Sequence, residues 1–204
     1  KQCARIGLHT ASMHIIDHHV CHAASAAFCS GFDSCIAVTV DGIGDALSGS
    51  VSVFRNGTLS RIAEISGKHS LGIFFEHVTN LLNMRELEDE GKVMALANYA
   101  YPIPDDKNPL MQLMSVDGLS VKCTCSSRKM YSDLKKILWH YPSEQFAAMA
   151  QRTLEAKLCQ IITNAVNNTG MHDVSLAGGV FSNIKANMRI RSLADVDRCY
   201  VFPH

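Results

Sequence analysis

Apolar and polar positions along the chain follow two alternating periods, which predict strands and helices in turn. Residues 13–16 form a short apolar group that predicts a strand, and the alanine-rich run over 18–28 favours a helix. The nearly continuous β-branched run over 35–40 is typical of a strand covered on both faces. This strand is expected to end in the loop 41–45, which contains two glycines and two aspartates.

The next segment has the pattern of a β-hairpin. Two alternating runs, 50–55 and 58–65, flank Asn56-Gly57, a pair that tolerates the positive φ angles of a two-residue turn. Apolar residues then recur with helical spacing over 70–82, where Ser70 is a candidate N-cap, and again over 91–99. We therefore expect a hairpin followed by two helices.

The second half begins with a proline-containing segment, 101–108, which we interpret as a surface connection and a hinge between two lobes. The elements expected after it are a long helix from Ser143 to about Val166, a strand over 173–177, a helix over 181–193 and a strand over 198–202. Strands that alternate with helices, together with one hairpin, predict an α/β fold with a mixed sheet and flanking helices.

Composition narrows the function classes. The 204 residues are 47% hydrophobic, which is enough for one sizeable core, and 19 basic residues balance 19 acidic ones. This balance argues against nucleic acid or an anionic membrane as a partner, and no apolar run approaches the ~20 residues that cross a bilayer. The eight cysteines lie mostly alone in apolar stretches, which favours a reducing, cytoplasmic setting. Cys123 and Cys125 lack the spacing of a zinc knuckle, so we interpret them as structural.

Two histidines at the start of the first helix are candidate metal ligands. His18 and His22 stand four positions apart and therefore share one helical face, where two imidazoles can bind one ion. With 10 histidines in 204 positions, chance alone gives roughly half a pair at this spacing, so the spacing by itself is weak evidence. A third ligand, an aspartate or a glutamate, would be needed.

Three further segments have patterns that could bind phosphate. In the loop over 41–45, glycine N–H groups can approach phosphate oxygens and the carboxylates can hold a metal, although an ordinary turn is the alternative. Gly178-Gly179 joins a strand to a helix, where a ligand can lie against bare backbone, but a close packing turn competes with this view. Lys92 could reach phosphate from the start of its helix, or it could simply be solvated.

These segments together resemble a known family. In order, they match the signatures HHxxHAASA (18–26), VDGxGD (40–45), SLGxFFEHVT (70–79), GKVMALA (91–97) and LAGGVxxN (176–183) of the NodU/CmcH-type carbamoyltransferases. Each motif is weak alone, but five in the family's order make the resemblance specific. The resemblance implies an actin-like, sugar-kinase-like ATPase fold, similar to that of the threonylcarbamoyl transferases that act on tRNA.

The resemblance also implies a reaction. ATP and carbamoyl phosphate would give carbamoyl adenylate, and the carbamoyl group would pass to a hydroxyl of a small molecule. A divalent metal would be bound, with iron or zinc expected, and Mg²⁺ would accompany ATP. The remaining lobe and a second domain of a longer parent protein would be partners, since the resemblance implies that residues 1–204 are the central part of the ATPase-like domain.

Roles for individual residues follow from the same resemblance. His18 and His22 match the metal-binding histidines, and the family supplies a further metal-binding aspartate downstream. His19 is placed near phosphate, and His19 and Asp41 are the candidates for the general base. Among the residues expected to bind the nucleotide, a loop on the phosphate side is matched by Asp41, Gly42, Gly44 and Asp45, and the adenosine side by Gly178, Gly179 and Asn183. Lys92 falls in the family's lysine motif, without an assigned role.

Two alternatives stay open. One is transfer of a threonylcarbamoyl or related group within the same superfamily, as in hydrogenase-cofactor maturation, although the wording of the motifs favours carbamoyl transfer. The other is a module that binds a nucleotide without performing chemistry.

Overall fold

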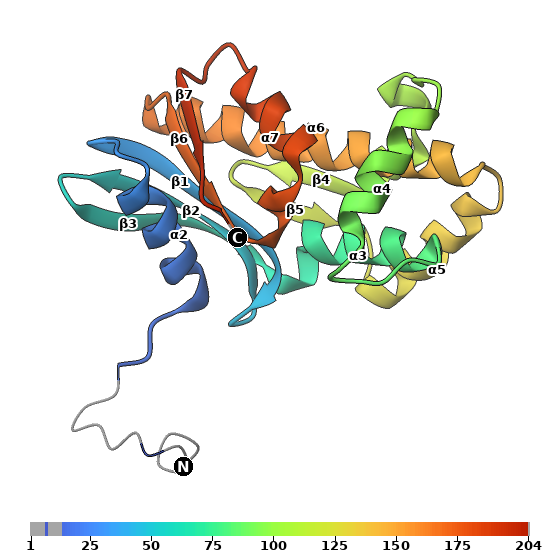
Figure 1. Ribbon diagram of the computed structural model, residues 1–204, viewed down its shortest axis with the longest axis horizontal. Helices are drawn as coiled ribbons and strands as arrows, with labels where there is room; N and C mark the ends of the chain where they lie inside the picture. The colour runs from blue at the N-terminus through green and yellow to red at the C-terminus, as the bar shows by residue number, and fades with distance from the viewer. Residues whose placement is uncertain (1–6, 8–13, 204) are drawn as a thin grey trace.

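The structure is a computed structural model that describes residue 7 and residues 14–203. Strands and helices are interspersed along the chain, and the first three strands follow one another directly (Figure 1). The strands are β1 (Ser34–Gly44), β2 (Leu47–Arg55), β3 (Thr58–Ser66), β4 (Met114–Asp117), β5 (Ser120–Cys123), β6 (Asp173–Ala177) and β7 (Arg198–Val201). The helices are α2 (His18–Cys29), α3 (Leu71–Leu81), α4 (Glu90–Leu96), α5 (Ser127–Leu138), α6 (Ser143–Thr169) and α7 (Ile184–Arg191).

A five-stranded mixed sheet organises the fold. Its strand order is β3-β2-β1-β6-β7, in which β1, β2 and β3 pair antiparallel while β6 is parallel to both β1 and β7. The predicted mixed α/β sheet is therefore confirmed. Strands β4 and β5 form a separate antiparallel pair, which is labelled near the middle of the molecule in Figure 1.

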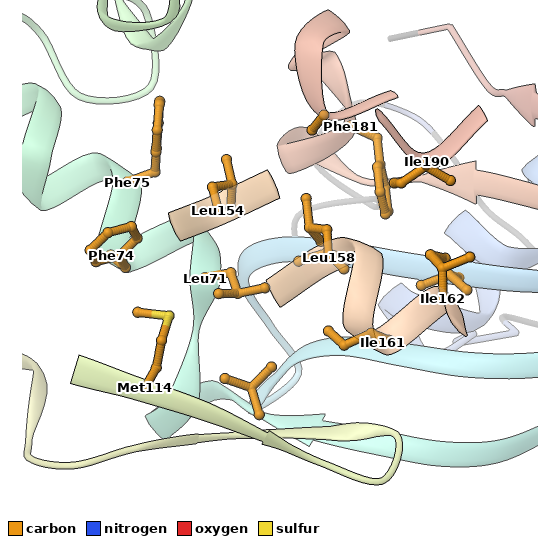
Figure 2. Packing of buried hydrophobic residues seen from close by; sticks show 14 of the residues in the cluster. Leu71, Phe74, Phe75, Met114, Leu154, Leu158, Ile161, Ile162, Phe181 and Ile190 are labelled. Carbon is orange, nitrogen blue, oxygen red and sulfur yellow. The ribbon is translucent and has the colours of Figure 1, made fainter. Parts of the chain in front are cut away.

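Helices cover both faces of the sheet. On one face, Ala23 and Ala27 of α2 pack against Cys35, Ala37 and Phe54, and these small side chains let the helix lie close to the sheet. The other face carries the main core, to which α3, α6 and α7 contribute. Figure 2 shows side chains from these helices filling this core, together with Met114 of β4. Both faces of β1 are thus buried, as its continuous apolar run predicted.

Several local signals act as expected. Asn56 and Gly57 have φ angles of 50° and 72° and connect β2 to β3, as a two-residue hairpin turn requires. The Ser70 side chain accepts a hydrogen bond from the Ile73 N–H and caps α3. Gly170 ends α6 in the left-handed conformation, with φ 66°.

Other expectations were wrong. Of the predicted strand over 13–16, residue 13 lies outside the described residues, and residues 14–16 form no strand. Ile15 and Ile16 are 90% and 61% exposed, and no described strand pairs with them, so their apolar character does not bury them in a sheet. The helix predicted to start at Phe181 is a 3₁₀ turn over Gly179–Ser182, and α7 begins only after Asn183, which caps it.

The C-terminal part of the proposed hinge segment, residues 105–108, is attached to helix α6. Asn108 is buried and donates hydrogen bonds to the carbonyl oxygen of Met149 and to Oγ1 of Thr153, while Asp105 pairs with Arg152. The hinge itself stays a prediction. In the part of the chain that the structure describes, no helix is long and apolar enough to cross a membrane.

Candidate functional site

The candidate site lies at the carboxyl ends of two parallel strands. Asp41 and Gly42 follow the buried part of β1, and Gly178-Gly179 follows β6, its parallel neighbour. Crevices outside the carboxyl ends of strands are the usual binding sites of open α/β sheets. The topology therefore brings together two of the segments that the sequence singled out, although residues 41–44, expected in a loop, continue β1 as far as Gly44.

Three side chains of types that can bind a metal ion converge beside these segments. Nε2 of His18 lies 3.1 Å from Oδ2 of Asp41, and Nε2 of His22 lies 3.2 Å from the same oxygen. One donor atom from each residue lies within 4.8 Å of the other two. Among the described residues this is the one such group, and Cys123 and Cys125 do not take part in it. Asp41 thus provides, within this chain, a carboxylate of the kind that a third ligand requires.

The start of α2, and with it both histidines, is fixed by two aspartates. The Asp17 side chain caps the helix by accepting the Val20 N–H, and Oδ2 of Asp45 accepts the backbone N–H of His18 at 2.8 Å. Gly44 lies against the His18 ring, since a Cβ on it would stand 2.2 Å from Cδ2 of that ring. Gly44 and Asp45, predicted to contact phosphate, therefore lie where they position the first histidine.

The Asp41 carboxylate has a distinct role for each oxygen. Oδ1 accepts the backbone N–H of Gly42 at 2.8 Å, whereas Oδ2 faces the two histidine rings. Burial opposes the charged form, but the Gly42 N–H and the two rings outweigh it and hold the pKa of Asp41 below its usual value. The carboxylate is therefore ionised at neutral pH, as a metal ligand must be.

The N-terminus of α3 closes over the backbone of the Asp41 loop. The Ser70 hydroxyl donates to the carbonyl oxygens of Asp41 and Gly42, at 3.1 and 2.6 Å. Gly72 makes this approach feasible, because a Cβ on it would lie 2.6 Å from the Asp41 carbonyl oxygen. The Ser70-Leu71-Gly72 sequence therefore lets the N-terminus of α3 pack against the backbone of Asp41 and Gly42.

A cavity of about 410 Å³ opens beside the histidines and contains Gly42 and Gly179 in its wall. It is lined by His22, Asp41, Gly42, Gly72, Phe75, Glu76, Leu87, Glu90, Gly91, Met94, Leu154, Gly179, Val180, Ser182 and Asn183. Gly178 is not in this lining. Its φ is 103°, and a Cβ on it would lie 2.4 Å from the Val40 carbonyl oxygen, so it serves close packing of strand and turn. Of the four glycines expected to bind the nucleotide, Gly42 and Gly179 thus line this cavity, whereas Gly44 and Gly178 do not.

Glu76 is a cavity residue that sequence reasoning missed. Its Oε1 lies close to Gly42, since a Cβ on Gly42 would be 2.8 Å from it, and no described residue forms a hydrogen bond or ion pair with its carboxylate. Burial, with the carboxylates of Glu90, Glu86 and Asp41, raises the pKa of Glu76. Its position four residues after Gly72 was the available signal, because that spacing places both on the helical face toward the loop.

Asn183 lies in the cavity wall and is held by an amide pair. Its Oδ1 accepts hydrogen bonds from the Ala186 N–H and from Nε2 of Gln151, and its Nδ2 donates to Oε1 of Gln151. Gln151 also donates to Glu155, and all three side chains are buried. The orientation of Asn183 is therefore fixed by Gln151 of α6. Sequence spacing did not reveal this pair of residues.

The structure argues against two sequence-based roles. The side chain of His19 is fully buried and its Nδ1 lies 2.9 Å from Oγ1 of Thr39, so it has no surface to offer a phosphate or a substrate hydroxyl. Burial also lowers the pKa of His19. Lys92 is exposed, pairs with Asp89 at 2.7 Å and is not part of the cavity lining, which fits the solvated alternative.

Comparison with known proteins identifies the family. A family model described as "Carbamoyltransferase N-terminus" matches residues 3–204. The chain belongs to this family. The resemblance found in the motifs is thereby confirmed.

The similar proteins are considerably longer than this chain. It is 30% identical over 182 residues to the protein MJ1051 of Methanocaldococcus jannaschii, covering 85% of this chain and 35% of that protein. It is also 28% identical to the nodulation proteins NolNO of Sinorhizobium fredii and NolO of Bradyrhizobium diazoefficiens, with 86% and 92% of this chain but 26% and 35% of theirs covered. The chain spans about a third of the length of such relatives.

Solved structures support the fold. Full-length HypF in a phosphate- and nucleotide-bound form has a TM-score of 0.55 at 14% identity, over 97% of this chain and 41% of that one. Component A of the (R)-2-hydroxyglutaryl-CoA dehydratase of Acidaminococcus fermentans has a TM-score of 0.53 at 16% identity, over 90% and 60%. The actin-like ATPase fold predicted from the motifs is confirmed.

Proposed function

We propose that this chain provides the nucleotide- and metal-binding site of an ATP-dependent carbamoyltransferase. In the proposed reaction, water hydrolyses carbamoyl phosphate to carbamate and phosphate, and a carbamate oxygen then attacks the α-phosphorus of ATP, so that pyrophosphate leaves and carbamoyl adenylate forms. The hydroxyl oxygen of a small acceptor then attacks the carbamoyl carbon, the bond from that carbon to the adenylate oxygen breaks, and AMP leaves. The rest of the longer parent protein would supply the other lobe and the second domain.

One observation carries this proposal. The group formed by His18, His22 and Asp41 stands at the edge of a cavity that also has bare glycine backbone, Gly42 and Gly179, in its wall. A cation site and unobstructed backbone beside one cavity are what a polyphosphate ligand needs. Family membership and the fold shared with a nucleotide-bound HypF support the same assignment.

The three side chains fit a divalent metal. Two imidazole nitrogens and one carboxylate oxygen are a donor set suited to iron or zinc, with positions left for other ligands. When bound, such an ion would neutralise charge on phosphate oxygens and polarise them. We propose His18, His22 and Asp41 as its ligands from this chain, and we expect Mg²⁺ to enter with ATP.

The chain's own cavity residues would orient the nucleotide. Gly42 and Gly179 let phosphates lie against the backbone, and Glu76 has free acceptor oxygens for the hydroxyls of the ribose. Asn183, held by Gln151, would present its amide to the same cavity. Because His19 is buried and Asp41 faces the histidines, we assign the general base to neither.

The experiment compares two adjacent glycines in the full-length protein. Gly179→Ala places a Cβ about 3.0 Å from the Asp41 side chain, at the cavity wall, and should weaken ATP binding and pyrophosphate release without unfolding the protein. Gly178→Ala meets the Val40 backbone at φ 103° and should lower the melting temperature instead. Carbamoyl-phosphate-dependent release of pyrophosphate from ATP is the decisive measurement.

The outcomes separate the candidate functions. ATP binding without any pyrophosphate release would favour a nucleotide-binding module. Release that depends on a threonylcarbamoyl donor or a hydrogenase-maturation substrate would favour the related transferases. Unchanged ATP binding in Gly179→Ala would contradict the placement of the nucleotide in this cavity.

A further inference from the structure

The loop between α3 and α4 contains a residue whose conformation is unfavourable and whose side chain faces the cavity. Among the described residues, the non-glycine residues with positive φ are Asp45, Ala46, Asn56, Asn83 and Leu87. Asparagine and aspartate tolerate this region, and Ala46 lies in the tight turn between β1 and β2. Leu87, with φ 67°, has neither explanation.

Local hydrogen bonds keep Leu87 in this conformation. Its backbone N–H donates to Oε1 of Glu90 at 2.8 Å. Asp89 closes the loop from both directions, since its N–H donates to the Arg85 carbonyl oxygen at 2.9 Å and its Oδ2 accepts the Arg85 N–H at 3.0 Å. These hydrogen bonds therefore stabilise the loop conformation in which the Leu87 side chain is exposed.

The Leu87 side chain gains no burial from this arrangement. It is 80% exposed, yet it belongs to the lining of the cavity, together with Met94 and Phe75. A large apolar side chain in an unfavourable backbone conformation, with no packing to stabilise it, indicates contact with something outside the chain.

Charge decides which part of a nucleotide can lie there. Oε1 of Glu90 accepts the Leu87 N–H and Glu86 precedes Leu87 in the chain, so two carboxylates place negative charge at this end of the cavity, whereas Oε1 of Glu76 lies beside Gly42. This charge repels phosphates, whereas a cation at His18, His22 and Asp41 would attract them. Figure 1 shows α2, which carries the two histidines, on the left of the molecule and α4, which follows Leu87, on the right. An uncharged planar group is what the carboxylate end can accept.

From this arrangement we infer that Leu87 contacts the base of the bound nucleotide and acts as a specificity-determining residue at that end of the cavity. The inference rests on the proposed function. Leu87 and Met94 provide the apolar surface, and Glu90 fixes the backbone that carries Leu87. The loop would then read the base while the glycines and the metal ligands bind the phosphates.

The test compares ATP with ribose 5-triphosphate, which has the same sugar and phosphates but lacks the base. Both are titrated into the full-length protein and into Leu87→Gly and Leu87→Asn, two variants that suit a positive φ and remove the apolar side chain. ATP binding should weaken about tenfold in both variants, as expected for a partly covered leucine. Binding of ribose 5-triphosphate should not change. Ile62→Ala, at an exposed apolar residue of β3 outside the cavity, is the control.

Three results would overturn the inference alone: ATP binding unchanged in the variants, both ligands weakened equally, or a wild-type protein that binds the two ligands with equal affinity. Binding of neither ligand by the wild-type protein would overturn the proposed function, and the inference with it.

Discussion

Gly72 lies so close to the Asp41 backbone that a Cβ on it would be 2.6 Å from the Asp41 carbonyl oxygen. This contact joins the first turn of α3 to the end of β1, which carries the Asp41 carboxylate that we propose as a metal ligand. We predict that Gly72→Ala lowers the free energy of unfolding by about 1–3 kcal/mol, because the backbone on both sides must move apart. Urea denaturation measures the change.

Gly91→Ala is the matched control for this substitution. A Cβ at Gly91 meets nothing within 4 Å and lies within helix α4, so alanine should be neutral or stabilising by up to about 1 kcal/mol. Equal stability effects in the two variants would mean that the approach of α3 to the Asp41 loop is not tight.

The sequence predicted the parts of the fold that rest on local chemistry. The turn at Asn56-Gly57 and the end of α6 at Gly170 depend on φ angles that few residues adopt. The shared face of His18 and His22 follows from helical spacing. The predictions omitted β4, β5 and α5, although local signals mark them: Gly118, with φ 58°, turns β4 into β5, and Met130 and Leu134 share the buried face of α5.

The candidate site was less predictable because its contacts join distant segments. The convergence of Asp41 with the two histidines requires α2 to lie on one particular face of β1. The free carboxylate of Glu76 depends on how closely Gly72 lets α3 approach. His19 has the same residue type and surroundings in the sequence as His18, and only the packing of α2 against Thr39 shows that it is buried.

Removal of one proposed ligand should abolish stable metal binding. In the full-length protein we expect His22→Ala to weaken iron or zinc binding by more than about 100-fold, since loss of even an outer partner of a metal ligand costs roughly 10–100-fold. Metal content after gel filtration, measured by mass spectrometry, is the readout. His172→Ala, whose ring contacts the Asp195 carbonyl oxygen away from the site, should keep full metal content.

Asp41→Asn tests whether the third ligand comes from this chain. The amide retains the shape of the side chain but loses its charge, so metal content should fall together with that of His22→Ala. Full retention of metal by Asp41→Asn would show that Asp41 only orients the histidine rings and that another carboxylate binds the ion.

The buried amide pair between α6 and α7 should contribute to both stability and ligand binding. Gln151→Met removes the partner of Asn183 and should cost about 1–3 kcal/mol of unfolding free energy, because buried polar atoms lose their hydrogen bonds. ATP affinity should fall as well, since Asn183 loses its fixed orientation. Gln112→Met, at an exposed position, is the control for both measurements.

Residues 1–204 produced alone should not catalyse carbamoyl transfer. The relatives are about three times longer, and the family resemblance places a further lobe and another metal-binding aspartate outside this chain. A single well-placed electrostatic contact can be worth ~10²–10³ in rate, so their combined loss should leave no measurable turnover. Pyrophosphate release and acceptor carbamoylation, followed beside the full-length protein, provide the test. Turnover near the parent rate would show that the catalytic residues lie within this chain.

The Glu76 carboxylate should lower the free energy of unfolding at neutral pH, although we propose that it helps to bind the nucleotide. Burial, with three neighbouring carboxylates, raises its pKa above the ordinary value of 4.5. As pH rises above 4.5 the unfolded chain therefore loses this proton before the folded protein does, so ionisation favours unfolding. The stability penalty develops between 4.5 and the raised pKa and is complete above it.

Glu76→Gln should accordingly be more stable than the wild-type protein at pH 7, with a difference that disappears near pH 4, where both states keep the proton. The variant should also bind ATP roughly three- to tenfold more weakly, because a neutral oxygen is a poorer acceptor for the ribose hydroxyls than a carboxylate. Thermal unfolding at pH 4 and pH 7, and titration with ATP, measure the two effects. Asp106→Asn, at an exposed carboxylate outside the cavity, is the control. A Glu76→Gln protein that is less stable at pH 7 would show that the carboxylate has a stabilising partner, and its oxygens would then not be free to bind a ribose.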